Sequence, residues 1–197
     1  MDTAGNKVRA IAAAFSLLLV VVAIGRVSSA AFTDTTDNSA NTFDAGDVTI
    51  TDDDGGATAM FSLPDMAPGD TATRCINVTY AGTLQADVVL YGSHDGGGLE
   101  DHLALTIERS TGAGGGTGFD CTGFVEAGLV PIWDPTDGTI GAFTALNDGV
   151  TNSADSRSDP GTSNDVASYR FTVTLLDNDA AQGLSSLVAF TWRASSA

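Results

Sequence analysis

Alternation of apolar with polar or small residues is the feature that most constrains how this chain can fold. Four segments carry apolar side chains at every second position. These positions are Ile76, Val78 and Tyr80; Leu103, Leu105 and Ile107; Tyr169, Phe171, Val173 and Leu175; and Val188, Phe190 and Trp192. Successive side chains of a strand point to opposite faces, so this period places one face on a core and the other in water. The pattern is typical of antiparallel sheets.

Clusters of Gly, Asp, Asn and Ser separate the alternating segments and predict turns and loops. They occupy residues 52–56, 92–98, 112–118 and 147–165, and the last is long for a loop in a compact domain. Helical periodicity is nearly absent, and we expect one short helical turn within residues 177–183. The sequence therefore predicts an all-β fold, an antiparallel β-sandwich with long Gly/Asp-rich loops.

The N-terminus has the layout of a secretory signal peptide. Lys7 and Arg9 precede an uncharged run of 16 residues (10–25), and small residues lead up to Ala30. The run is shorter than the roughly 20 residues with which a helix spans a bilayer. We expect cleavage after Ala30, which makes Ala31 the new N-terminus; an uncleaved anchor is the alternative.

This division predicts three parts: a helical signal peptide at 1–30, an N-terminal segment at 31–46, and a β-sandwich domain at 47–197. Removal of the first 30 residues leaves five arginines, no lysine and 24 acidic residues, and hence a net charge of −19. A chain of this charge repels nucleic acid and anionic lipid, so we expect no nucleic-acid partner.

The two cysteines, Cys75 and Cys121, lie 46 positions apart. In an exported protein they favour one disulfide, which stabilises the fold chiefly by restricting the unfolded chain. Two buried free thiols are the alternative.

No set of residues with catalytic spacing stands out, and we expect no enzyme and no cofactor. His94 and His102 lack a third histidine and the HExxH spacing of a zinc site, so we expect both on the solvated surface. In the run Ser93-His94-Asp95, neighbouring residues cannot point at one another as a catalytic triad requires. The chain also lacks a GxSxG motif, and the expected mature part has no lysine for a P-loop.

Calcium is the one metal that the sequence leaves open. Asp52, Asp53 and Asp54 form one oxygen-rich loop, and Asp134 with Asp137 form a second. Neither loop follows the EF-hand spacing, and solubilising turns are the alternative interpretation.

Short motifs recur in a fixed order along the expected mature chain. They are AFTD at 31–34, NTF at 41–43, AG at 45–46, PGD at 68–70, Arg74, GTL at 82–84, GL at 98–99, Leu103, Tyr169, Phe171, Val173, QG at 182–183, Ser185, Phe190 and Trp192. Together they resemble the TasA/CalY (camelysin) family of exported proteins. Asp47-Val48 departs from the Thr-Leu common in that family, Met66 replaces a branched residue, and the resemblance predicts neither the cysteines nor residues 112–165.

The resemblance implies a jelly-roll-like β-sandwich that is secreted to the extracellular matrix or cell surface and polymerises into biofilm-matrix or pilus-like fibres. The implied partners are further copies of the chain, accessory matrix proteins, and a SipW-type signal peptidase that removes the signal peptide. Some members of the family are described as surface metalloproteases. That activity does not carry over, because the sequence shows no zinc-ligand set.

The N-terminal segment offers a route to such fibres. Once Ala31 is free, the segment could add as a strand to the sheet of a neighbouring copy, with Phe32 and Phe43 as apolar anchors and Val48 and Ile50 in alternation. Alternatively, residues 42–51 are simply the first strand of their own sandwich. The rival functions are a calcium- or glycan-binding adhesive module and a secreted hydrolase.

Overall fold

The computed structural model of the chain describes residues 45–56, 58–112, 114, 118–147, 152–161 and 164–196. The signal-peptide cleavage site at Ala30 and Ala31 and the anchors Phe32 and Phe43 lie outside this range, so they stay predictions. Within the described residues, no helix has the length and apolar character needed to cross a membrane.

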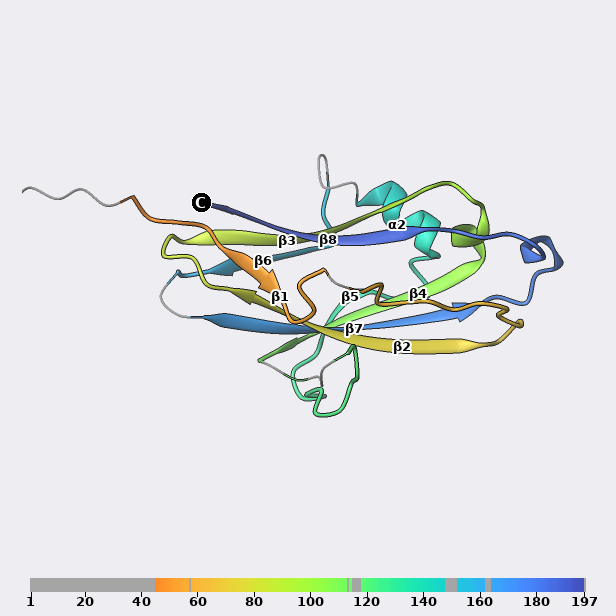
Figure 1. Cartoon of the computed structure of the whole chain (residues 1–197), viewed down its shortest axis with the longest axis horizontal. Helices are drawn as coiled ribbons and strands as arrows, with labels where there is room; N and C mark the ends of the chain where they lie inside the picture. The colour runs from red at the N-terminus through yellow and green to blue at the C-terminus, as the bar shows by residue number, and fades with distance from the viewer. Residues whose placement is uncertain are drawn as a thin grey trace, which may run out of the picture. The chain divides into compact units, whose positions relative to one another are not determined.

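The described residues form two antiparallel sheets (Figure 1). In spatial order, the five-stranded sheet contains β1 (Ile50–Asp52), β2 (Thr71–Tyr80), β7 (Asp165–Leu175), β4 (Leu103–Thr111) and β5 (Val130–Trp133), and the three-stranded sheet contains β6 (Asp155–Asp159), β3 (Ala86–His94) and β8 (Val188–Ser196). The helix α2 (Ile140–Leu146) and the 3-10 helices η1 (Leu99–His102) and η2 (Asp179–Ala181) complete the described elements. The predicted all-β sandwich is confirmed.

The core lies between the two sheets and is centred on β7. Tyr169 and Phe171 of this strand are fully buried. Their rings contact Trp192 and Phe190 of β8, with centroids 5.2 Å (Tyr169–Trp192) and 4.6 Å (Phe171–Phe190) apart. A fully buried aromatic side chain stabilises a fold by about 1.5–3 kcal/mol, so β7 and its contacts contribute much of the driving force. The four alternating segments of the sequence are confirmed as β2, β4, β7 and β8.

Three elements differ from the sequence-based expectation. β3 runs into the expected loop 92–98, and β6 crosses the expected loop 147–165. α2 was not expected; it begins after Thr139, whose hydroxyl accepts a hydrogen bond from Ala142 N at 3.3 Å and so caps the helix. The expected helical turn within 177–183 is present as η2.

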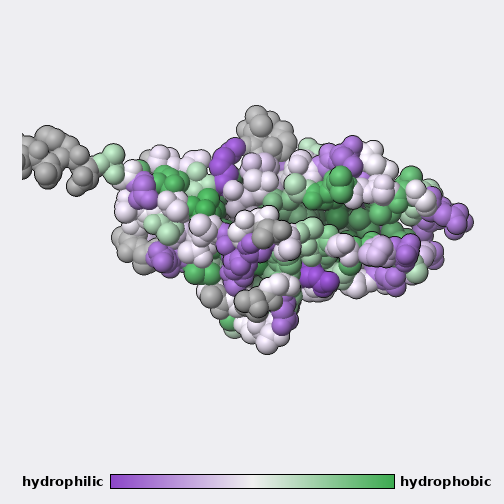
Figure 2. Space-filling view, in the orientation of Figure 1, coloured by the Kyte–Doolittle hydropathy of each residue, from purple (hydrophilic) through white to green (hydrophobic). Residues whose placement is uncertain are grey.

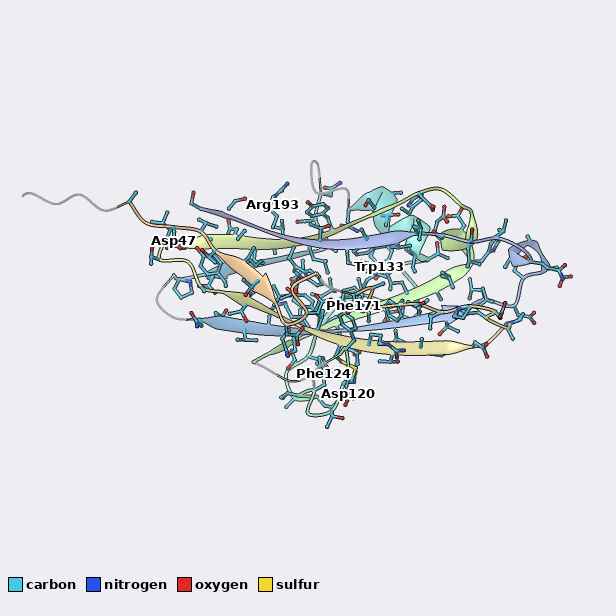
Figure 3. The ribbon with its side chains drawn as sticks, viewed as in Figure 1. Asp47, Asp120, Phe124, Trp133, Phe171 and Arg193 are labelled. Atoms are coloured by element: carbon cyan, nitrogen blue, oxygen red, sulfur yellow. A yellow bond between two sulfur atoms is a disulfide. The ribbon has the colours of Figure 1, made fainter. Side chains whose placement is uncertain are left out.

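A disulfide joins Cys75 in β2 to Cys121 in the connection between β4 and β5. This connection lies against the outer face of the five-stranded sheet, and Figure 3 shows its residues Asp120 and Phe124 below that sheet. The Phe124 ring sits 4.7 Å from the guanidinium of Arg170 on the outer face of β7.

Candidate functional site

An apolar groove of about 530 Å³ opens between the two sheets, on the side where β8 ends the three-stranded sheet. Its walls are mainly apolar side chains from both sheets and from the chain that links β1 to β2, and the polar residues Thr51, Asp52, Asp54, Thr58, Ser186 and Thr191 also line it. The apolar residues include Val188, Phe190 and Trp192 of β8; Ile50, Ile76 and Val78 of β1 and β2; Met60, Phe61, Leu63 and Met66 of the linking chain; and Leu99, Leu103 and Ile140. Figure 2 shows hydrophobic residues gathered in the hollow between the two layers.

The groove exists because β8 is a terminal strand of its sheet. Phe190 and Trp192 point toward the core, yet both are only half-buried, whereas Tyr169 and Phe171 opposite them are fully buried. Among the described residues, no strand lies beyond β8 to cover these aromatic rings. The outer edge of β8 also receives no hydrogen bond from another described residue, which leaves a row of main-chain donors and acceptors available.

One segment partly covers the groove, and we name it the crossing segment (residues 53–56 and 58–66). Figure 1 shows it running from β1 toward β2 along the open side. Its start is fixed, because Asp53 N donates to Asn77 O at 3.2 Å and Asn77 Nδ2 donates to Asp53 Oδ2 at 2.8 Å. From Ala59 to Met66, however, no hydrogen bond joins it to other described residues. Apolar contacts of Met60, Phe61 and Met66 with the core hold this part in place.

The described chain enters the sandwich at Asp47, which is fixed to the turn between β2 and β3 (Figure 3). Its carboxylate accepts hydrogen bonds from the hydroxyl of Thr83 at 2.8 Å and from that of Thr49 at 2.9 Å. These bonds, that of Thr83 above all, lower the pKa of Asp47. Asp47 N in turn donates to the Thr83 hydroxyl at 2.9 Å. The start of the domain therefore has a defined anchor.

Two of the residues predicted for polymerisation are described. Ile50 is the first residue of β1 and pairs with Tyr80 of β2, so it belongs to its own sheet, and its side chain also lines the groove. Val48 lies just before β1 and is exposed. The structure therefore places Ile50 in its own sheet and Val48 outside any strand.

The aspartates proposed for calcium accept hydrogen bonds within their own loops, except Asp53, which binds Asn77 of β2. Asp52 Oδ1 accepts from Gly55 N at 2.6 Å, Asp53 binds Asn77, and Asp54 Oδ1 accepts from Gly56 N at 2.9 Å. In the second loop, Asp134 Oδ1 accepts from Thr136 N at 2.9 Å and Asp137 Oδ2 from Asp134 N at 2.8 Å. Burial and the neighbouring Asp54 raise the pKa of Asp52. These hydrogen bonds are those of tight polar turns.

His94 lies on the surface, as expected, but its ring has two side-chain partners. At the end of β3, its Nδ1 lies 2.6 Å from the hydroxyl of Thr144 in α2, and its Nε2 lies 3.5 Å from Oε1 of the buried Glu100. Its surface position was expected, but these contacts were not, because they come from α2, which the sequence pattern does not reveal and which packs against β3. His102 Nδ1 lies 3.3 Å from Asn178 Nδ2.

The other side of the sandwich, along β6, contains a polar cluster that the sequence did not suggest. Asp155 Oδ2 lies 2.8 Å from Arg109 Nε of β4 and accepts a 2.8 Å hydrogen bond from the Tyr169 hydroxyl of β7. Arg157 Nη1 lies 2.6 Å from Asp165 Oδ2, and Asp159 is fully buried. Burial, and then the charge of Asp155, raises the pKa of Tyr169. This cluster joins the two sheets along β6. The side along β8 has no such cluster among the described residues, and its groove is the candidate binding site.

In a comparison with known protein families, part of the chain matches one family. Residues 6–95 match the family described as camelysin metallo-endopeptidase. The match covers a little under half of the 197 residues and includes β1, β2 and β3. No curated protein matches the chain.

Proposed function

Because the chain belongs to the TasA/CalY (camelysin) family, we propose that it is a secreted structural subunit that polymerises into extracellular fibres. In this proposal the N-terminal segment (residues 31–46) of one copy lies in the groove of the next and adds as a strand to the outer edge of β8. The observation that carries the proposal is the apolar groove beside this uncovered edge.

The length of the segment is compatible with donation. The segment leaves the domain at the anchored Asp47, and a fully extended chain of its length reaches about 50 Å. A strand of nine residues such as β8 is about 30 Å long. The segment is therefore long enough to follow β8 of a neighbouring copy from end to end.

The chemistry of the segment matches that of the groove. Phe32 and Phe43 are its two large apolar residues, and each stabilises a complex by about 1.5–3 kcal/mol when fully buried. Main-chain hydrogen bonds to β8 add to this, and the entropy lost on association opposes both. Because donor and acceptor are different surfaces, each copy can bind the next without closing a ring, which gives filaments.

The part of the chain that the structure describes offers no ligand set for the metallopeptidase activity in the family's description. Among the described residues, no three His, Cys, Asp or Glu side chains lie together as metal ligands. His94 is bonded to Thr144 and lies next to Glu100, while His102 lies beside Asn178. We therefore base no proposed function on a bound zinc ion.

Deletion of residues 31–45 tests the proposal. We expect the shortened chain to keep the circular dichroism of the native protein and to form no filaments in electron micrographs. Phe43→Asp should also weaken assembly strongly, and Asn38→Asp, which adds the same charge without removing an anchor, should not. Normal filaments from the shortened chain would contradict strand donation, and so would loss of folding, since the segment would then belong to its own sheet.

A further inference from the structure

Two sheet edges border the groove, and a donor strand lying in it could extend either sheet. One edge is β8. The other is the part of β2 that β1 leaves uncovered, because β1 pairs only with Val78, Thr79 and Tyr80. An edge strand with free main-chain groups pairs readily with another chain, so a second acceptor would permit a second mode of assembly.

The edge of β2 is covered by other means. Cys75 N donates to Phe119 O at 3.0 Å, and Asn77 O accepts from Asp53 N at 3.2 Å. Arg74 Nη1 bonds its neighbour's carbonyl, Thr73 O, at 2.8 Å. These contacts occupy main-chain groups that an added strand would need.

The disulfide fixes this cover in place. Ile76 and Val78 face the core, so by alternation Cys75 lies on the outer face of β2, where it bonds Cys121. Two residues earlier in the chain, Phe119 passes the edge and places its side chain, 8% exposed, among the residues that line the groove. Phe119 has a φ of 65°, a conformation that is costly for an aromatic residue and persists where its surroundings impose it. The disulfide on the outer face of β2 and the Phe119 ring on its inner face together hold this turn against the edge of β2.

The remaining edges of the described sheets are poor acceptors for different reasons. β1 has only three residues, and β5 has four and contains Pro131. β6 has five residues, of which Asp155, Arg157 and Asp159 are charged. β8 has nine residues, and Arg193 is its one charged side chain. From these differences we infer that the disulfide-held turn at Phe119 and Cys121 is an edge cap that excludes donor strands from β2 and directs assembly to β8.

This inference rests on the proposed strand donation, and hydrogen exchange of assembled protein tests it. Cys75 N and Asn77 O point to the outer edge of β2, so by the antiparallel pattern the amides of Thr71 and Thr73 do so as well. In wild-type filaments we expect amides of β8 to exchange at least about tenfold more slowly than in unassembled protein, with Thr71 and Thr73 unchanged. In filaments of the Cys75→Ser, Cys121→Ser double variant, Thr71 and Thr73 should slow by a similar factor, and filament width should become irregular.

The controls separate the cap from general loosening of its loop. Glu126→Gln weakens the contact of the same loop with Arg170 but keeps the disulfide, so it should behave as wild type. If the double variant does not fold, Phe119→Ala replaces it as the test. This variant keeps the disulfide and removes the Phe119 ring from the groove, and we expect the same slowing of amide exchange at Thr71 and Thr73.

Two outcomes would overturn the inference while strand donation stands: slowed exchange at Thr71 and Thr73 in wild-type filaments, or unchanged exchange there in filaments of both cap variants. Absence of slowed exchange along β8 in the wild type would instead overturn the proposed function, and the inference with it.

Discussion

The two sides along which the sheets meet are built in opposite ways. On the β6 side, charged and hydroxyl groups bridge the sheets, with Asp155 between Arg109 and Tyr169. On the β8 side, Phe190 and Trp192 remain half-buried beside a groove that the crossing segment covers through apolar contacts.

This difference separates two tasks. A buried ion pair adds little net stability over an apolar contact, but breaking it is costly, so it ties β6 to one position over β4 and β7. Exposed apolar surface is the opposite case, since it gains free energy when another chain covers it. The β6 side, which these polar contacts close, defines the fold. The β8 side, where the groove is open, is available for association.

Breaking the closed side should have the largest effect on stability. Asp155→Asn removes the charge that pairs with the largely buried Arg109, and we expect it to lower the free energy of unfolding by about 3–5 kcal/mol. Urea unfolding measures this effect. Asp87→Asn, on the exposed face of β3, is the matched control and should stay within about 0.5 kcal/mol of wild type. Equal stability of the two variants would show that the cluster does not join the sheets.

Changing the open side should do the reverse, with little effect on folding and a large one on assembly. Leu187 is 75% exposed and lines the groove, whereas Leu146 is 57% exposed on α2 and lies outside it. We expect Leu187→Asp and Leu146→Asp each to change the free energy of unfolding by no more than about 0.5 kcal/mol. Sedimentation should show that Leu187→Asp alone loses filaments; loss with both variants would point to charge repulsion rather than to the groove.

The smallest effect on stability concerns Asp47, the anchored residue that directly follows the N-terminal segment. Hydrogen bonds from Thr83 and Thr49 lower the pKa of Asp47, so this carboxylate stabilises the fold above its unfolded pKa. That contribution is lost as the pH falls through the lower, folded pKa, below about pH 4. The NMR shift of the Thr83 amide should therefore titrate below the ordinary pKa of aspartate, and the transition should vanish in Asp47→Asn. A midpoint at or above the ordinary value would contradict the anchor.

The strands that the sequence pattern predicts and those that it does not are also divided between the apolar and the polar parts of the sandwich. β2, β4, β7 and β8 were identifiable because their inward residues are apolar at every second position. The sequence pattern predicts a loop at β6 because its inward residues, Asp155, Arg157 and Asp159, are charged, and only their partners on other strands explain their burial. The sequence pattern does not indicate α2, because seven residues are too few for a clear helical period.

The groove could not be predicted for a different reason. Phe190 and Trp192 alternate as regularly as Phe171 and Val173 do, so the local pattern predicts the same burial for all four residues. Their exposure depends on β8 being a terminal strand of its sheet, which is a property of the strand order. Of the polymerisation residues expected from the sequence, the structure describes Val48 and Ile50 and shows Ile50 in its own sheet.

Mixing two assembly-deficient chains tests the central claim most directly. The chain without residues 31–45 keeps the groove and lacks the donor, while Leu187→Asp keeps the donor and has a blocked groove. Each alone should remain a monomer by sedimentation velocity, and an equimolar mixture should form a one-to-one heterodimer that grows no further, because neither free end can continue. A mixture that stays monomeric, or filaments from either chain alone, would contradict donation of the N-terminal segment to the groove beside β8.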